Sequence, residues 1–294
     1  MILPLEILMP KDLNEVLNLL AERRNNLHII AGGTDIIPGL QQSSNRFANS
    51  EFLIDINKVA RVKGIHKTKE KFSIGAAETF SEILENDLIK NELPVLWKAV
   101  STIGSVQIRN RATIGGNFIN NAPCADTVPA LLVYNSTIEI ESLSTKKEIT
   151  FNDFLVGPYK TKLNHDEIVT RINIPIPPKE LVGDFYKLGR RRAVAISRIT
   201  LAVLMKLQNE MIDEIRIASG AVTPIGIRFF ELEKFAKGKR ADDQFLKNLS
   251  AKLGEEILRV TGLRWSSEYK LPVVQQMFYQ LLYDLVILNH GDGK

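Results

Sequence analysis

The chain has 294 residues, of which 45% are hydrophobic and 24% charged, proportions typical of a globular protein. Its apolar runs are too short to span a bilayer, and its first residues lack the basic and apolar stretches of a secretory signal, so we expect a cytoplasmic protein without a membrane span. The net charge of +4 comes with acidic residues interspersed nearly one for one and with no zinc-finger or RNA-binding signature, which argues against a nucleic-acid partner. The single cysteine, Cys124, excludes an intramolecular disulfide and cannot by itself hold an iron–sulfur cluster.

The first 176 residues mix predicted helices with predicted strands. Apolar periodicity predicts helices at residues 12–24, 79–89, 93–103 and 125–134. Short apolar or alternating runs predict strands at residues 27–30, 52–56, 71–75, 136–142, 147–151 and 168–174, the last three as an antiparallel set. Prolines at positions 175, 177 and 178 end this stretch, and we place a domain boundary there, between residues 176 and 177.

Residues 177–294 predict a second domain of strands followed by helices. The strands, at residues 183–188, 200–208 and 211–219, form a three-stranded antiparallel meander in which Asn209 and Glu210 make the tight connection. The helices, at residues 229–237, 242–258 and 273–288, have the apolar recurrence of helices that pack on one another or on that sheet.

Two glycine pairs, each followed by a polar side chain, are the candidate functional motifs. They are Ala31-Gly32-Gly33-Thr34-Asp35, at the end of a predicted strand, and Thr113-Ile114-Gly115-Gly116-Asn117. A glycine pair lets the backbone take a positive φ and leaves no Cβ in the way, so successive N–H groups can point at phosphate oxygens. The spacing is not that of a Rossmann or Walker motif. The alternative is that each pair is only a tight turn.

The sequence around these pairs carries a family resemblance. The second pair lies in IGSVQIRNRATIGGN, residues 103–117, and the string continues through APCAD at residues 122–126. Together with AGGTD at residues 31–35, IGAAET at 74–79, DEI at 166–168 and YKL at 186–188, it resembles the FAD-binding (medium) subunits of the molybdenum hydroxylases, the family of xanthine, nicotinate and aerobic carbon monoxide dehydrogenases. The resemblance covers nearly the whole chain.

This resemblance implies an α+β fold with two domains. The first would be an FAD-binding domain of the molybdenum hydroxylase (PCMH) type at residues 1–176, with subdomains at about residues 1–57 and 58–176. The second, at residues 177–294, would be a C-terminal domain of the CO dehydrogenase flavoprotein type, with a three-stranded antiparallel sheet and a helical bundle.

The resemblance also implies roles for single residues. The two glycine loops would hold the FAD pyrophosphate from opposite sides, and Asp126 would lie near the adenosine ribose. Val169 would lie against the isoalloxazine ring, and the Lys187 ammonium beside the flavin would favour its reduced, anionic form. The whole expected set is Ile29, Ile30, Ala31, Gly32, Gly33, Thr34, Asp35, Ile36, Ala76, Ile103, Gly104, Thr113, Gly115, Gly116, Asn117, Asp126, Val169 and Lys187.

Further, the resemblance implies an electron relay between subunits. A large molybdopterin subunit would hydroxylate the substrate, 2Fe-2S clusters on a small subunit would pass on the electrons, and FAD on this chain would collect them for NAD or another acceptor. We therefore expect a heterotrimer, single or doubled by two-fold symmetry. No metal site is expected on this chain, because His28, His66, His165 and His290 lack metal-ligand spacing and are interpreted as structural or exposed. Residues 186–188, 195–197 and 264–270 resemble the bacterial purine and nicotinate dehydrogenase subunits more than the carbon monoxide dehydrogenase ones, and this resemblance favours an N-heterocyclic substrate for the complex.

Two alternatives belong to other functional classes. A self-contained flavoenzyme of the same FAD fold, similar to UDP-N-acetylenolpyruvoylglucosamine reductase, would need its own substrate acid, and no convincing Ser/Glu pair for that role is present. A non-catalytic nucleotide-binding protein would keep the glycine loops but show no redox activity.

Overall fold

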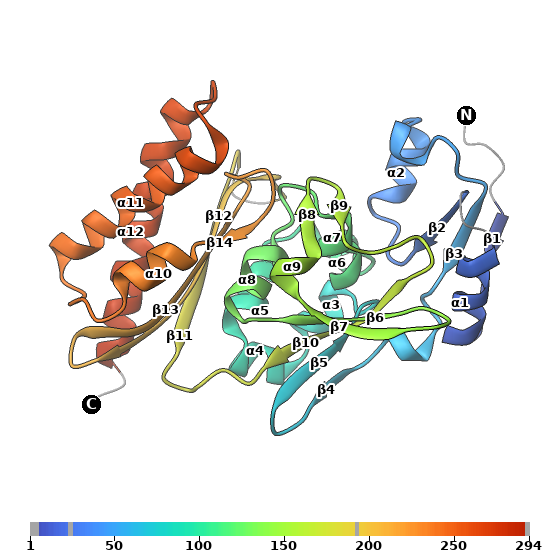
Figure 1. The fold of residues 1–294 in the computed structure, drawn as a ribbon, viewed down its shortest axis with the longest axis horizontal. Coiled ribbons are helices and arrows are strands. Elements are labelled where there is room, and N and C mark those ends of the chain that lie inside the picture. The colour runs from blue at the N-terminus through green and yellow to red at the C-terminus, as the bar shows by residue number, and fades with distance from the viewer. Residues whose placement is uncertain (1–5, 23–25, 192–193, 292–294) are drawn as a thin grey trace.

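The computed structural model describes residues 6–22, 26–191 and 194–291 of the chain. Figure 1 shows an N-terminal, a central and a C-terminal part in a row, and each part has its own sheet. Three clusters of buried apolar side chains follow the same order. The central cluster also takes in Phe185, Ala202 and Leu204 from the C-terminal sheet, so the central and C-terminal parts share a core.

The N-terminal part is a small parallel sheet covered by a helix. Its strands lie in the order β1 (Glu6–Leu8), β3 (Phe52–Asp55), β2 (Leu27–Ile30). Helix α1 (Leu13–Glu22) buries Val16, Leu17 and Leu20, which recur at helical spacing, in the same cluster as Ile54. The short helix α2 (Ile36–Gln41) and the 3-10 helix η1 (Asn45–Phe47) lie between β2 and β3. The carboxyl end of β2 therefore leads directly into the first glycine pair.

The central part is built on a five-stranded antiparallel sheet. Its order is β4 (Ile65–Lys67), β5 (Lys71–Gly75), β10 (Ile168–Pro175), β6 (Thr137–Glu141), β7 (Lys146–Thr150). The 3-10 helix η2 (Ala60–Val62) leads into this sheet, and a separate hairpin pairs β8 (Leu155–Gly157) with β9 (Lys160–Thr161). The helices are α3 (Phe80–Leu84), α4 (Asp87–Glu92), α5 (Pro94–Ser101), α6 (Val106–Arg109), α7 (Ile114–Asn120), α8 (Thr127–Val133) and α9 (Phe151–Phe154).

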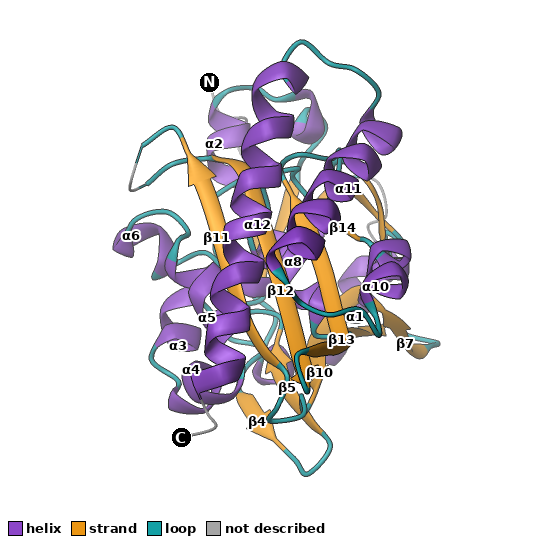
Figure 2. Ribbon diagram, turned by 90° about the vertical axis from the view of Figure 1, so that its left-hand side faces the viewer, coloured by secondary structure: helices purple, strands orange, loops and turns teal. Residues whose placement is uncertain are grey.

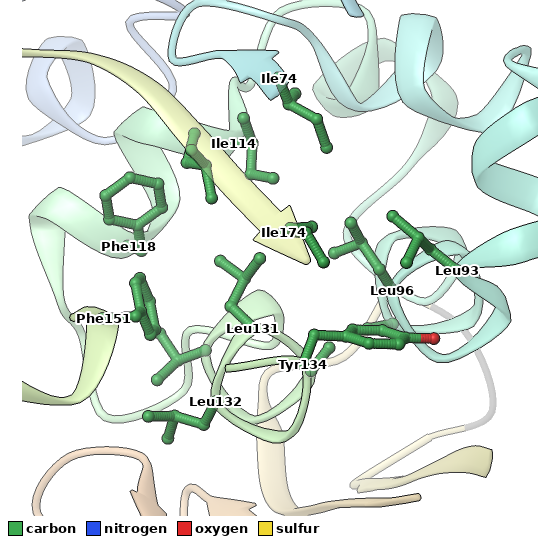
Figure 3. Close-up of a cluster of buried hydrophobic side chains, with 14 of the residues drawn as sticks. Ile74, Leu93, Leu96, Ile114, Phe118, Leu131, Leu132, Tyr134, Phe151 and Ile174 are labelled. Atoms are coloured by element: carbon green, nitrogen blue, oxygen red, sulfur yellow. The ribbon is translucent and has the colours of Figure 1, made fainter. Parts of the chain in front are cut away.

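Helix α8 lies at the centre of the core. All of its residues are buried, as expected for a helix that is apolar on every side. In Figure 3, Leu131 lies between the ring of Phe151 on one side and that of Tyr134 on the other. The Tyr134 hydroxyl accepts a hydrogen bond from the Val95 N–H at 3.2 Å, which gives this buried polar group a partner.

The single helix expected at residues 79–89 is wrong, because the structure has two helices there. Thr79 and Glu82 form a capping box that starts α3. The Asn86 side chain then accepts from the Ile89 N–H at 3.1 Å and starts α4. An asparagine at an N-cap competes with helix continuation, so the apolar period runs across a break that the cap creates.

The C-terminal part is an antiparallel sheet of β11 (Val182–Gly189), β12 (Ser197–Gln208), β13 (Met211–Gly220) and β14 (Ile227–Arg228). Alternate residues of β12 face opposite cores: Leu201 and Val203 pack under the C-terminal helices, Ala202 and Leu204 against the central part. Asn209 and Glu210 both have positive φ, as a tight hairpin turn requires, which confirms the predicted connection. The expected three-stranded sheet gains the short strand β14 at its edge.

The last helices are α10 (Phe230–Ala236), α11 (Asp243–Thr261) and α12 (Ser267–Gly291), and Figure 2 shows α11 and α12 lying across the sheet. Helix α12 starts earlier than expected and includes Pro272. Among the described residues it is the one helix long and apolar enough to span a membrane by length and composition. Its residues Val274, Phe278 and Leu282 are fully buried in the C-terminal cluster, which α11 also joins.

Candidate functional site

A cleft of about 610 Å³ is lined by residues of both the N-terminal and the central part. It is lined by the end of β2 and the loop after it, by the start of α7, and by the start of β10. Both glycine pairs therefore reach one cavity. The expected residues that line it are Ile29, Ala31, Gly32, Gly33, Thr34, Asp35, Ile36, Ala76, Ile103, Thr113, Gly115, Gly116, Asn117 and Val169. Ile30 and Asp126 are not among the residues that line it, and Gly104 and Lys187 line a second cavity.

The first glycine pair fits the cleft because neither position has room for an ordinary side chain. A Cβ atom on Gly32 would lie 2.1 Å from the carbonyl oxygen of Arg111. Gly33 has a φ of +75°, in the left-handed region that favours glycine. The loop is held from behind by Asn57, whose side-chain amide donates to the Ala31 carbonyl at 2.8 Å.

The backbone amides of this first loop are unusual. For the N–H groups of residues 32–36, the described part of the chain provides no hydrogen-bond acceptor, although all five residues line the cleft. Backbone N–H groups inside proteins are nearly always paired with protein, water or a ligand. A row of free amides in a glycine loop is the geometry of an anion-binding nest.

The second glycine pair plays a different part from the one expected of it. Its amides are already used within the protein: Gly115 N–H donates to the Ala76 carbonyl at 2.8 Å, and Gly116 N–H donates to the Thr113 hydroxyl at 3.1 Å. The expectation that these amides point at phosphate is therefore wrong for this structure. Gly115 is needed for close approach, because a Cβ there would lie 2.5 Å from the Ala76 carbonyl oxygen.

Asn117 is the polar group that the second loop does present. The Thr127 hydroxyl donates to its side-chain carbonyl at 2.6 Å. This bond leaves the Asn117 amide nitrogen facing the cleft without an acceptor among the described residues. The cleft thus offers backbone amides from one side and a side-chain amide from the other, a donor set suited to phosphate oxygens.

Comparison with known proteins identifies the family. Residues 3–177 match the family described as "FAD binding domain in molybdopterin dehydrogenase", and residues 184–285 match the "CO dehydrogenase flavoprotein C-terminal domain". The chain belongs to the FAD-binding subunits of molybdopterin-dependent dehydrogenases.

Relatives of this FAD-binding subunit match its sequence along nearly the whole chain. It is 33% identical to the xanthine dehydrogenase FAD-binding subunit of Escherichia coli O157:H7, over 95% of each chain. It is 32% identical to the glyceraldehyde dehydrogenase medium chain of Sulfolobus acidocaldarius, over 90% of this chain and 92% of that one. Its fold matches carbon monoxide dehydrogenase from Hydrogenophaga pseudoflava with a TM-score of 0.89, at 24% identity and over 96% and 97% of the two chains.

Asp126 and Lys187, the expected polar residues outside the cleft wall, form a nearly buried ion pair in this FAD-binding subunit. The Lys187 ammonium donates to the Asp126 carboxylate at 2.7 Å and to the Thr102 carbonyl at 2.9 Å. The Ser197 hydroxyl also donates to Asp126. Burial raises the pKa of the Asp126 carboxyl, and the Lys187 ammonium and the Ser197 hydroxyl oppose that rise.

This ion pair bears on two expected roles. The resemblance implies that Asp126 lies near the adenosine ribose and Lys187 near the flavin, and the structure places the two charged groups 2.7 Å apart. The sequence could not show this, because the two residues lie in different parts of the fold.

Several cleft residues were not predicted from the sequence. Arg46, Phe47 and Tyr159 line the cleft, and their segments contain no recognisable motif. His28 and His165 also line it; the exposure expected of His165 is confirmed, whereas His28 is half-buried. Burial and the neighbouring Arg46 lower the pKa of His28, which keeps its imidazole neutral near pH 7.

Proposed function

We propose that this subunit binds FAD in the cleft, with the pyrophosphate on the free amides of residues 32–36. This row of unpaired N–H groups is the observation that carries the proposal. The Thr34 hydroxyl and the Asn117 amide complete the donor set around the phosphates. Gly32 and Gly115 have no room for a Cβ atom, so no side chain at these positions separates a ligand from the backbone of the cleft wall.

We assign the adenosine ribose, rather than the flavin, to the neighbourhood of Asp126 and Lys187. The Lys187 ammonium is paired with Asp126 and the Thr102 carbonyl, so it is not a free cation for a reduced flavin. Asp126 retains lone pairs that can accept from ribose hydroxyls. Lys187 then acts as a positioning residue that opposes the rise in the pKa of Asp126 caused by burial. The isoalloxazine ring then packs on Ile168 and Val169, apolar residues that line the cleft.

The remaining functions belong to a complex. When bound, FAD supplies an acceptor that takes electrons one at a time and releases them in pairs. This chain has one cysteine, so any 2Fe-2S cluster that feeds it lies on a small partner subunit. We propose a large molybdopterin subunit as the site of substrate oxidation, NAD as the acceptor, and a heterotrimer as the basic assembly.

The relatives favour this reading over a self-contained reductase. Those that match over nearly the full length are subunits or chains of dehydrogenases or of a hydroxylase, such as the nicotinate dehydrogenase FAD-subunit of Eubacterium barkeri and the nicotine 6-hydroxylase medium subunit of Paenarthrobacter nicotinovorans. The substrate of the complex remains a proposal. Relatives of similar identity are named for xanthine and for glyceraldehyde, so likeness along this chain does not separate an N-heterocycle from an aldehyde.

The test is flavin binding by the purified chain, followed by assembly with its partners. Titration followed by flavin fluorescence should show one FAD bound per chain, and FMN, which lacks the adenosine monophosphate half, should bind at least about a hundredfold more weakly. Co-expression with the molybdopterin and iron–sulfur subunits should then give a complex that forms NADH with substrate. A chain that retains no flavin even within such a complex would contradict the proposal.

A further inference from the structure

The mouth of the cleft is spanned by Arg46. This residue lies in η1, and its guanidinium donates to the Asp35 carboxylate and, at 2.8 Å, to the Asn120 side-chain carbonyl. The guanidinium also lies 4.8 Å from the centre of the Phe47 ring and 4.6 Å from the centre of the Tyr159 ring. Asp35 and Arg46 belong to the N-terminal part, whereas Asn120 and Tyr159 belong to the central part. One side chain thus joins the two walls of the cleft.

The turn that carries Tyr159, which Arg46 contacts, is held in place by hydrogen bonds. Tyr159 lies in the turn between β8 and β9 with a φ of +58°, a conformation that a bulky residue rarely adopts. Its N–H donates to the Asn121 carbonyl at 3.0 Å. The Asn121 side-chain amide in turn donates to the carbonyls of Gly157 and Lys160, on both sides of the turn. The turn that carries the Tyr159 ring is therefore tied to the end of α7 before any ligand arrives.

The charge of the cleft points to a role for this arginine. Among the described residues that line the cleft, Arg46 is the one Lys or Arg, and the carboxylates are Asp35 and Glu167. Glu167 is paired with Lys147, so Asp35 is the carboxylate that depends on Arg46. Asp35 also lies within the row of free amides at residues 32–36. Without Arg46, a bound anion would meet an unneutralised carboxylate beside the amides that hold it.

We propose that Arg46 is the cation that matches the pyrophosphate of the bound dinucleotide, held at the cleft mouth by Asp35, Asn120 and Tyr159. The inference rests on the proposed binding of FAD in this cleft. Arg46 acts in two ways: it neutralises Asp35, and its planar guanidinium presents further N–H donors toward phosphate oxygens on the adjoining amides.

The experiment compares FAD affinity and its salt dependence among matched variants of the full chain. Arg46→Ala should weaken FAD binding about tenfold or more at low salt, and added salt should recover part of the loss, because it screens the repulsion between Asp35 and the phosphates. Arg46→Lys keeps the positive charge but loses the planar set of guanidinium N–H donors. Its FAD affinity should therefore lie between those of the wild type and Arg46→Ala. Arg240→Ala is the control, because Arg240 makes one exposed ion pair with Glu210 in the C-terminal part, as Arg46 does with Asp35.

A double variant separates the neutralisation of Asp35 by Arg46 from the contact that Arg46 makes between the two walls of the cleft. Adding Asp35→Asn to Arg46→Ala removes the carboxylate that Arg46 neutralises and should restore part of the lost affinity. FAD binding by Arg46→Ala within twofold of the wild type, or a double variant no better than Arg46→Ala, would overturn the inference while leaving FAD binding intact. A wild-type chain that binds no FAD would instead overturn the proposed function itself.

Discussion

Gly32 lies directly against the backbone of Arg111, and this contact joins the N-terminal part of the molecule to the central part. A Cβ atom on residue 32 would lie 2.1 Å from the Arg111 carbonyl oxygen and 2.8 Å from the Ala112 Cα. Both neighbours are backbone atoms, which cannot turn aside as the end of a flexible side chain can. The first glycine of the pair is thus required for the two walls of the cleft to meet.

Gly32→Ala should therefore separate the walls of the cleft. We expect a loss of about 1–3 kcal/mol in the free energy of unfolding, the usual cost of forcing extra volume into a tight contact, together with weaker FAD binding. Thermal unfolding and FAD titration measure the two effects. Gly157→Ala is the control, because nothing lies within 4 Å of a Cβ at that position. Equal behaviour of the two variants would refute the close-approach account.

Gly33 tests backbone conformation rather than space. Its φ is +75°, and the atoms nearest to a Cβ there would belong to the flexible side chains of Ile30 and Ile37, at 3.3 Å. Gly33→Ala should cost roughly 1 kcal/mol from the left-handed conformation, and Gly33→Asn should cost less, because asparagine tolerates that region. Chemical denaturation of both variants shows which of the two is more stable. A Gly33→Asn variant less stable than Gly33→Ala would show that crowding, not φ, decides.

Asn57 tests the support of the first loop. Its side-chain amide donates to the Ala31 carbonyl at 2.8 Å, and it is not itself among the residues that line the cleft. Asn57→Ala should lower FAD affinity about three- to tenfold, the size of one net hydrogen bond, through looser placement of the amides of residues 32–36. Faster release of FAD in stopped-flow measurements is the expected sign. Unchanged release would mean that the loop holds its shape without Asn57.

The Asp126–Lys187 pair predicts a dependence on pH. Because burial raises the pKa of Asp126, the folded state binds this proton more tightly than the unfolded state, and the carboxyl's contribution to stability falls as pH rises from its ordinary range through the raised pKa. Lys187→Met removes the ammonium that opposes the rise. The free energy of unfolding of Lys187→Met should fall below that of the wild type by an amount that grows from about pH 5 to pH 8. This difference should reach about 3 kcal/mol, as expected for breaking a buried ion pair.

Urea denaturation across that pH range measures the deficit. Lys206→Met is the control, since Lys206 pairs with Asp213 on the surface and its loss should cost little at any of these pH values. A deficit for Lys187→Met that is constant with pH would contradict the account, because a purely steric loss does not titrate.

Local sequence signals predicted the elements that are short and apolar. The strands at residues 27–30 and 71–75 lie where expected, because uninterrupted apolar or alternating runs define them. Helix α7 was not predicted, because it opens with the glycine pair at 115 and 116, poor helix formers that Thr113 nonetheless caps. Tertiary contacts to Ala76 and Thr127 hold that helix, and a local pattern does not contain them.

In the candidate site too, features within consecutive residues were predicted from the sequence, and contacts between distant segments were not. The glycine loops were found because their chemistry lies within a few consecutive residues, and both reach the cleft. The contact between Arg46 and Tyr159, and that between Asp126 and Lys187, bring together residues from distant segments. No spacing rule connects such residues, so their roles become visible only once the fold places them side by side.

The most direct test of the account uses the single cysteine as a reporter of the cleft. Cys124 lines the cleft and is half-buried, and burial raises the pKa of its thiol, so alkylation should be slow but measurable at mildly alkaline pH. Mass spectrometry of the intact chain would follow alkylation by N-ethylmaleimide with and without FAD. The account predicts that saturating FAD slows labelling of Cys124 by at least about tenfold, whereas riboflavin, which lacks the phosphates, does not. FAD that binds to the chain yet leaves Cys124 labelling unchanged would contradict the placement of the dinucleotide between the two glycine loops.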